Sequence, residues 1–297
     1  MSNLNATIPA LIFLTLFSCI TINSGNNKLI GYNLTSPDVS IILPDILKEV
    51  SGVTYLGSNF FACIQDENGI LFIYNMLKNK LENQFTFTID GDYEGIARVD
   101  KTIYVLRSDG ALFEISDYES KDFTLDVYFT KIPSKENEGL CYDPDNKRLL
   151  IACKGKTDKG SDDRRVIYGF DLKTKTLTND PVFDFDLNVI KKFALDNKVN
   201  LPVRKKKKEK IAEPIIKFET SAICIHPITN RLYLISASDH LLFIFNMNGN
   251  IEHIELLSPY FFNYSEGISF FENGDMVISN EGHGKSPALL RFNFKKE

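Results

Sequence analysis

Three glutamates in this chain each stand directly before a glycine, and their side chains could bind a cation if the fold brought them together. They are Glu94, Glu138 and Glu266, and Ser51 and Ser221 hold the same position in two related segments. Carboxylate oxygens without thiolates or paired histidines favour calcium or magnesium over zinc. Three carboxylates around a narrow axis bind a cation, share a proton or lie beside basic side chains. The three glutamates are therefore possible metal ligands, and Ca²⁺ is the possible cofactor.

The small residue after each of these positions recurs at a regular spacing. These residues, which are separated by 43, 44, 83 and 45 positions, are Gly52, Gly95, Gly139, Ala222 and Gly267. After each come an aliphatic residue and short apolar runs separated by turn residues, as in a series of β-hairpins. Four strands in about 40–45 residues match one blade of a β-propeller. The spacing predicts an all-β, five-bladed propeller of four-stranded antiparallel blades, and a β-sandwich would not produce it.

The long gap and the last unit need separate explanations. We interpret about 187–214 as a charged, partly helical insertion on a five-bladed ring, with a degenerate sixth blade as the alternative. The last unit ends near Phe294 without a fourth strand. Either Leu29–Leu34 or Val39–Leu43 could supply it, which would close the ring and remove its exposed edges.

The antiparallel meander predicts where the side chains of interest gather. It places the start of the first strand and the end of the second at the same end of each blade. The five leading residues should therefore form a ring at one mouth of the central channel. Residues at the ends of the second strands should surround this ring, and the candidates among them are Asp66, Arg107, Lys154, Asp239, His240, Glu281 and His283.

Several interpretations of this mouth stay open. Each leading residue could hydrogen-bond the neighbouring blade, with glycine allowing close approach. The mouth could also hold a ligand or a cation, with Arg107 and Lys154 offsetting the carboxylates. A calcium-dependent hydrolase, lactonase-like or phosphoesterase-like, is a further alternative, for which His240 and His283 would be the general-base candidates. We expect His226, in a His-Pro turn, to be solvated.

The N-terminus has the pattern of a targeting segment. The apolar run from Ile8 to Phe17 is too short to span a bilayer, and it ends in Leu16-Phe17-Ser18-Cys19. This ending resembles the lipobox of bacterial lipoproteins, which implies a signal peptide over 1–18 and lipidation of Cys19. Residues 19–28 would be a tether and 29–297 the propeller. An ordinary cleaved signal or a buried first strand are the alternatives.

The composition limits the classes of partner. The chain has 34 Lys and Arg against 39 Asp and Glu, a net charge of −5, so we expect no nucleic-acid partner. The basic run at 204–210 is typical of a solvated loop. We expect a monomer. A Cys141–Cys153 bridge within one blade stays open.

Several of these motifs together resemble the SdiA-regulated, YjiK-like family of bacterial propellers. The stretches that carry the resemblance are Glu49-Val50-Ser51-Gly52, Asp92-Tyr93-Glu94-Gly95, Asn137-Glu138-Gly139-Leu140 and Ser265-Glu266-Gly267-Ile268. The resemblance implies a five-bladed fold in the bacterial cell envelope, anchored by lipid to the outer membrane and facing the periplasm. It implies no particular activity. We therefore expect a binding module for a small molecule, a cation or an envelope protein.

Overall fold

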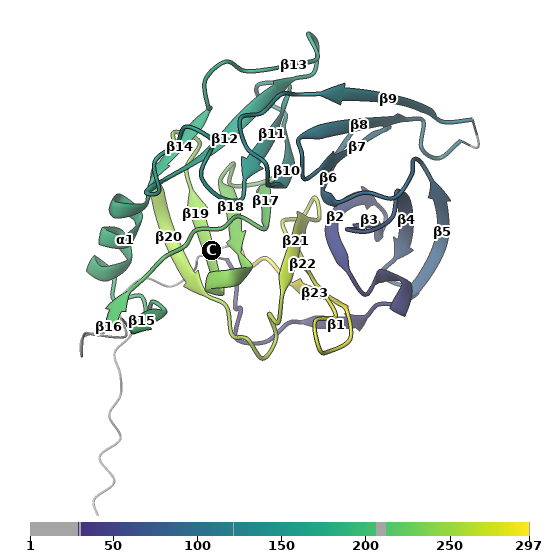
Figure 1. The fold of residues 1–297 in the computed structure, drawn as a ribbon. Coiled ribbons are helices and arrows are strands. Elements are labelled where there is room, and N and C mark those ends of the chain that lie inside the picture. The colour runs from purple at the N-terminus through teal and green to yellow at the C-terminus, as the bar shows by residue number, and fades with distance from the viewer. Residues whose placement is uncertain (1–28, 30, 121, 206–211, 297) are drawn as a thin grey trace, which may run out of the picture.

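Five antiparallel sheets stand around a central axis in the computed structural model, which describes residues 29, 31–120, 122–205 and 212–296 (Figure 1). The fold is a five-bladed β-propeller, as the glycine spacing predicted, and a sixth blade is not formed by the described residues. The first two blades are each a meander of four strands running outward from the axis. The first blade is formed by β2 (Val50–Gly57), β3 (Phe60–Gln65), β4 (Ile70–Asn75) and β5 (Lys80–Thr86). The second is formed by β6 (Tyr93–Val99), β7 (Thr102–Arg107), β8 (Ala111–Ser116) and β9 (Thr124–Phe129).

The remaining three blades vary this plan. The third consists of β10 (Asn137–Asp143), β11 (Arg148–Cys153) and β12 (Arg164–Asp171), with β13 (Thr176–Leu177) and β14 (Phe183–Asp186) both paired to β12. The fourth consists of β17 (Ala222–Ile225), β18 (Leu232–Ser236), β19 (Leu241–Phe245) and β20 (Ile251–Leu256). The fifth consists of β21 (Ser265–Phe270), β22 (Met276–Asn280), β23 (Ala288–Phe292) and the N-terminal β1 (Val39–Ile42). Single 3₁₀ turns cover Asp45–Leu47 and Ala237–Asp239.

The N-terminal strand closes the ring. β1 pairs antiparallel with β23, with Val39 opposite Arg291 and Ile42 opposite Ala288. The second of the two proposed segments is therefore the closing one. The fifth blade is thus built from both ends of the described chain, which joins the ring with a hydrogen-bonded strand pair.

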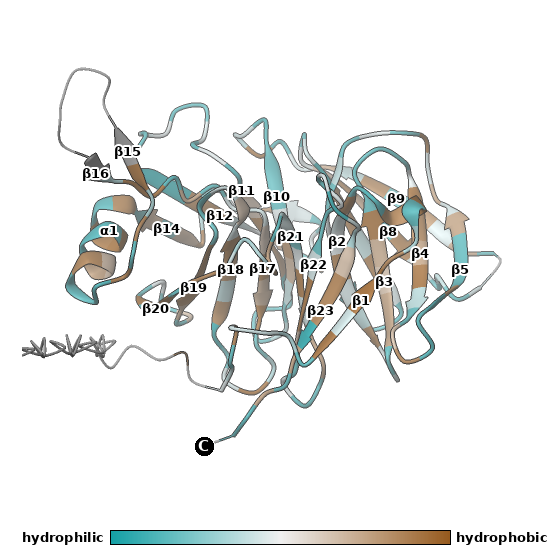
Figure 2. Ribbon diagram, turned by 90° about the horizontal axis from the view of Figure 1, so that it is seen from below, coloured by the Kyte–Doolittle hydropathy of each residue, from teal (hydrophilic) through white to brown (hydrophobic). Residues whose placement is uncertain are grey.

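The segment between the third and fourth blades lies outside the ring. Helix α1 (Leu187–Asp196) begins at Asp186, whose carboxylate accepts a hydrogen bond from the Asn188 amide at 2.8 Å. Ile190 and Ala194 of α1 are buried against β14 and its neighbours. The hairpin of β15 (Val203–Lys205) and β16 (Ala212–Pro214) follows at the same edge (Figure 2). Within the described ranges, no helix is long and apolar enough to cross a membrane.

The repeated glycines let adjacent blades approach closely. A Cβ atom built on Gly52 would lie 3.0 Å from the side chain of Ile96 in the next blade, and one on Gly95 would lie 2.7 Å from Cβ of Leu140. In the same way, a Cβ atom on Gly139 of the third blade would contact Ile223 of the fourth, and one on Gly267 of the fifth would contact Val53 of the first. Each glycine therefore packs against the aliphatic residue that follows the glycine or alanine of the neighbouring blade. This contact explains the repeated pattern in physical terms.

Replacing Gly95 by alanine should destabilise the propeller by about 1–3 kcal/mol, because the added methyl must displace the next blade's first strand. Urea unfolding measures this loss. The matched control is Gly155→Ala, since a Cβ there meets nothing within 4 Å. Equal midpoints for the two variants would show that this close approach is not needed.

The chain before β1 is fixed by a buried polar cluster. His226 is fully buried, so its expected place in a solvated turn is wrong. Its Nδ1 accepts hydrogen bonds from the amides of Ile228 and Thr229 at 3.0 and 3.1 Å. Its Nε2 therefore carries the proton and donates to the Tyr32 hydroxyl at 2.8 Å, which in turn donates to the Gly274 carbonyl. This chain of bonds ties the N-terminal segment to the fourth and fifth blades.

The cysteines in the described part of the chain are free thiols. They are Cys63, Cys141, Cys153 and Cys224. The bridge that the sequence left open between Cys141 and Cys153 is therefore not formed. Burial raises the pKa of the Cys63 thiol to about 12, so it packs as a small apolar side chain.

Candidate functional site

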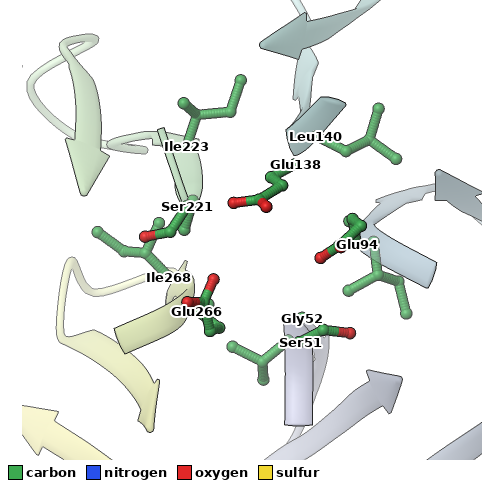
Figure 3. Close-up of a pocket in the computed structure, with 14 residues that line it drawn as sticks. Ser51, Gly52, Glu94, Glu138, Leu140, Ser221, Ile223, Glu266 and Ile268 are labelled. Atoms are coloured by element: carbon green, nitrogen blue, oxygen red, sulfur yellow. The ribbon is translucent and has the colours of Figure 1, made fainter. Parts of the chain in front are cut away.

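The five leading residues meet at one mouth of the central channel, as the meander predicted. Figure 3 shows their side chains converging on a pocket, one from each blade. The ring consists of Ser51, Glu94, Glu138, Ser221 and Glu266. Because each residue starts the innermost strand of its blade, the five-fold arrangement alone brings them together.

A β-bulge presents the axial residue in four of the five blades. In the first blade Val50 pairs with Gln65 and Gly52 with Ile64, which leaves Ser51 as the extra residue. The same register shift occurs around Glu94, Glu138 and Glu266. A bulge frees one residue from the ladder and turns its side chain away from the pleat. Here it directs the side chains toward the axis.

The pocket is small. Its cavity volume is about 10 Å³, roughly the space that one water molecule needs. One buried aliphatic side chain from each blade also lines the pocket, namely Val53, Ile96, Leu140, Ile223 and Ile268. Pockets for small organic molecules usually measure about 300–1,000 Å³. The pocket therefore suits water or a single ion better than an organic ligand.

The two serines of the ring connect neighbouring blades. The Ser51 hydroxyl donates to the Tyr93 carbonyl of the second blade at 2.6 Å. The Ser221 hydroxyl donates to the Ser265 carbonyl of the fifth blade at 2.7 Å. The structural interpretation that the sequence left open thus holds for the serines. The glutamates make no such contact with a neighbouring blade's backbone in the described structure.

The side chain of Lys154 brings one positive charge close to all three axial glutamates. Lys154 forms an ion pair with Glu138, and although burial opposes it, this pair raises the pKa of the lysine. Burial raises the pKa of Glu138 to about 7 despite the lysine. Burial and the charge of Glu138 raise the pKa of Glu94 to about 8. The pocket thus disfavours the full negative charge of its own side chains.

Glu266 is the axial carboxylate with the least compensation. It is only 9% exposed, points into the pocket and forms no hydrogen bond or ion pair with any described residue. Burial, followed by the charge of Glu138, raises its pKa well above the ordinary value. A buried carboxylate without a donor is costly unless it is protonated or bound to a cation.

A second acidic group lies beside the ring, between the first and fifth blades, and we call it the seam cluster. It consists of Glu49, Asp66 and Glu281, which each offer an oxygen within 4.8 Å of the other two. Oδ1 of Asp66 is buried without a hydrogen-bond donor. Burial and the Glu49 charge raise the pKa of Asp66 to about 6, and burial and the same charge raise that of Glu281 to about 7. Among the described residues, this is the one trio compact enough to bind a single ion without rearrangement.

The other predicted residues fall into different roles. Arg107 pairs with Asp109 at 2.8 Å on its own blade, so it does not offset the axial charge. Asp239 accepts hydrogen bonds from the amides of Lys217 and Phe218 and from the Ser236 hydroxyl. Its carboxylate therefore fixes the backbone conformation of the segment that leads into β17.

The two histidines proposed as bases do not line the pocket. His240 ends the 3₁₀ turn after β18 with a left-handed backbone (φ 51°). His283 stacks on Tyr264, with ring centroids 5.3 Å apart. Tyr264 lies two residues before Glu266, and burial and the nearby charge of Glu266 raise its pKa. Cys19 lies outside the described residues.

Sequence reasoning missed Glu49 and Tyr264. Both lie in the chain that leads into a first strand, two residues before the axial position. The backbone there contacts the neighbouring blade, since the Gly282 amide donates to the Lys48 carbonyl at 2.7 Å. An acidic residue stands two positions before the axial residue in four of the five repeats, and this pattern was the signal that could have identified Glu49.

Comparison with known proteins supports the fold. No protein-family profile matches the chain, and no curated protein sequence does so. The structure is similar to that of the Myxococcus xanthus glutaminyl cyclase, with a TM-score of 0.58 and 12% identity over 88% of this chain and 97% of that one. A streptogramin B lyase aligns with a TM-score of 0.45 and 11% identity over 89% and 97% of the two chains. At 12% identity, the similarity to the cyclase shows the fold alone.

Proposed function

We propose that this propeller is a binding module of the bacterial cell envelope, related to the SdiA-regulated, YjiK-like family, and that its channel mouth binds a calcium ion. The observation that carries the proposal is Glu266, a nine-tenths buried carboxylate aimed into the pocket without a partner. Glu94 and Glu138 line the same pocket, and Lys154 alone is paired with an axial carboxylate. A divalent cation would supply the missing positive charge.

The donor set favours calcium. The axial ring and the seam cluster offer only oxygen ligands, and calcium takes six to eight of these, water included. No histidine or cysteine lines the axial pocket in the described structure, and an all-oxygen donor set suits calcium better than zinc. Because the pocket is too small for an organic substrate, ion binding accounts for the site better than the calcium-dependent hydrolase does.

The entry of the chain supports an orientation for an anchored protein. Tyr32 lies at the turn between β21 and β22, whereas Glu266 lies at the opposite end of β21. A ten-residue tether from Cys19 would span at most about 35 Å. A lipid at Cys19 would thus hold the far face toward the outer membrane and leave the mouth open to the periplasm.

Thermal unfolding with and without calcium tests the proposal. At a hundred times its Kd, calcium should stabilise the protein by about 2.7 kcal/mol and raise Tm by about 5–10 °C. Glu266→Gln should abolish the shift, because it keeps the shape and removes the charge. Glu272→Gln, at an exposed turn on the far face, is the matched control and should retain it.

A third variant locates the ion. Glu281→Gln removes a charge from the seam cluster and should weaken the calcium shift without abolishing it, because it lies beside the axial site. If Glu281→Gln abolishes the shift while Glu266→Gln keeps it, the axial site is wrong and the ion binds in the seam. No shift for the wild-type protein would contradict the proposal as a whole.

A further inference from the structure

The outer strand of the second blade carries an unusual apolar edge. β9 is the last strand of its sheet, so its outer side has no pairing partner in the described chain. Leu125, Val127 and Phe129 alternate along it and therefore share one face. They are 36%, 40% and 72% exposed. The strand thus combines unpaired backbone groups with a continuous apolar stripe.

Two of the other outer strands have the protection that edge strands usually carry. β5 presents Lys80 and Glu82, which form an ion pair, and β20 presents Glu252 in a pair with Arg231. Charged side chains on an edge discourage another strand from pairing. In β9 the apolar face carries no charge. Asp126, the one carboxylate of the strand, lies on the opposite face.

We propose that β9 pairs antiparallel with β9 of a second copy of this chain, with Val127 on the two-fold axis. In this register Leu125 of one copy lies opposite Phe129 of the other, and the two valines face each other. The apolar stripe then continues across the interface. Asp126 of one copy lies opposite Tyr128 of the other, whose ring carries Lys175 at 5.3 Å from its centre. This lysine pairs with Glu114 of its own copy, so Asp126 would face an ion pair rather than a second unpaired carboxylate.

Charge selects this register over its neighbours. Moving the axis to Asp126 would place two carboxylates directly opposite each other, which is destabilising. Moving it to Tyr128 would place Leu125 opposite Lys131 and expose part of the stripe. Only the register centred on Val127 aligns apolar with apolar and avoids like charges. An isologous contact of this kind closes on itself and gives a dimer.

The pairing leaves the channel mouth accessible. β9 lies at the rim of the ring, away from the axial strands and from α1 (Figure 1). The dimer is thus independent of calcium binding, so each proposal can fail without the other.

A single cysteine tests the register. Opposed residues in an antiparallel pair have Cα atoms about 4.5–5.5 Å apart, which suits a disulfide. Under mild oxidation, Val127→Cys should form a covalent dimer with native calcium response. Leu77→Cys, at a turn position that is 79% exposed, is the matched control and should cross-link much more slowly. Equal cross-linking of the two variants would overturn the register.

Analytical ultracentrifugation measures the mass of the protein in solution without any covalent cross-link. The wild-type mass should rise with concentration toward that of a dimer, and Val127→Lys should remain monomeric with an unchanged Tm. A wild-type protein that stays monomeric at the highest concentration measured would refute the proposal, and so would a dimer that Val127→Lys leaves intact.

Discussion

Without divalent cations, the free energy of unfolding should fall by about 2–3 kcal/mol as the pH rises from 6.5 to 8. The cause is the group of buried carboxyls at the mouth, where burial raises the pKa of Glu138 and of Glu281 to about 7 and that of Glu94 to about 8. These groups bind more protons in the folded chain than in the unfolded one, where the ordinary value is 4.5. Stability that is present at low pH is therefore lost as the pH rises through the folded pKa values.

Urea unfolding in EDTA at the two pH values measures this slope. Calcium should reverse it, because the ion binds the ionised carboxylates and displaces their protons. The triple variant Glu94→Gln, Glu138→Gln and Glu266→Gln should flatten most of the slope, and Glu272→Gln should leave it unchanged. Equal stability of the wild type at both values would mean that the mouth carboxyls are ionised without cost.

Replacing His226 by alanine should cost about 3–5 kcal/mol at pH 7, the largest effect expected of a single substitution here. The change removes a fully buried ring, leaves the amides of Ile228 and Thr229 without their acceptor, and removes one of the two hydrogen bonds of the Tyr32 hydroxyl. Tyr32→Phe, which keeps the ring and loses only the hydroxyl, should cost less. His283→Ala, on a surface loop, is the control and should stay near the wild type.

The same histidine gives a second, opposite pH dependence. Burial lowers the pKa of His226 to about 4 from the ordinary 6.5. The unfolded chain therefore binds the extra proton first, and stability falls as the pH drops from 6.5 toward 4. Above pH 6.5 the ring is neutral in both states, which separates its effect from that of the carboxyls. His226→Ala should lose this acid-side slope, and an unchanged slope would show that the ring is not kept neutral by the fold.

The fold could be predicted because each repeat carries the same small residue, which close packing against the next blade requires. Gly52, Gly95 and Gly139 each allow a close contact with the next blade, so their spacing gives the number of blades. The axial ring followed from the same positions, since symmetry brings equivalent residues to one axis. No sequence pattern predicted the β-bulges that turn these side chains toward the axis.

The features that were missed depend on contacts between segments that are distant in the chain. The turn containing His226 looked solvated, but Tyr32 and Gly274 cover it from nearly 200 and about 50 residues away in sequence, and turn composition cannot reveal a partner of this kind. Arg107 and Lys154 both lie where a second strand ends, but the register makes Cys153 the equivalent of Arg107, and Lys154 comes one residue later. Only the lysine pairs with an axial carboxylate, whereas the arginine pairs with Asp109.

The central claim is that a cation completes the charge of the axial pocket. A crystal structure of the protein grown with calcium, with anomalous scattering measured, tests it most directly. We predict an anomalous peak on the channel axis about 2.3–2.6 Å from a carboxylate oxygen of Glu266. A pocket that holds only water, or a peak confined to the seam cluster of Glu49, Asp66 and Glu281, would contradict it.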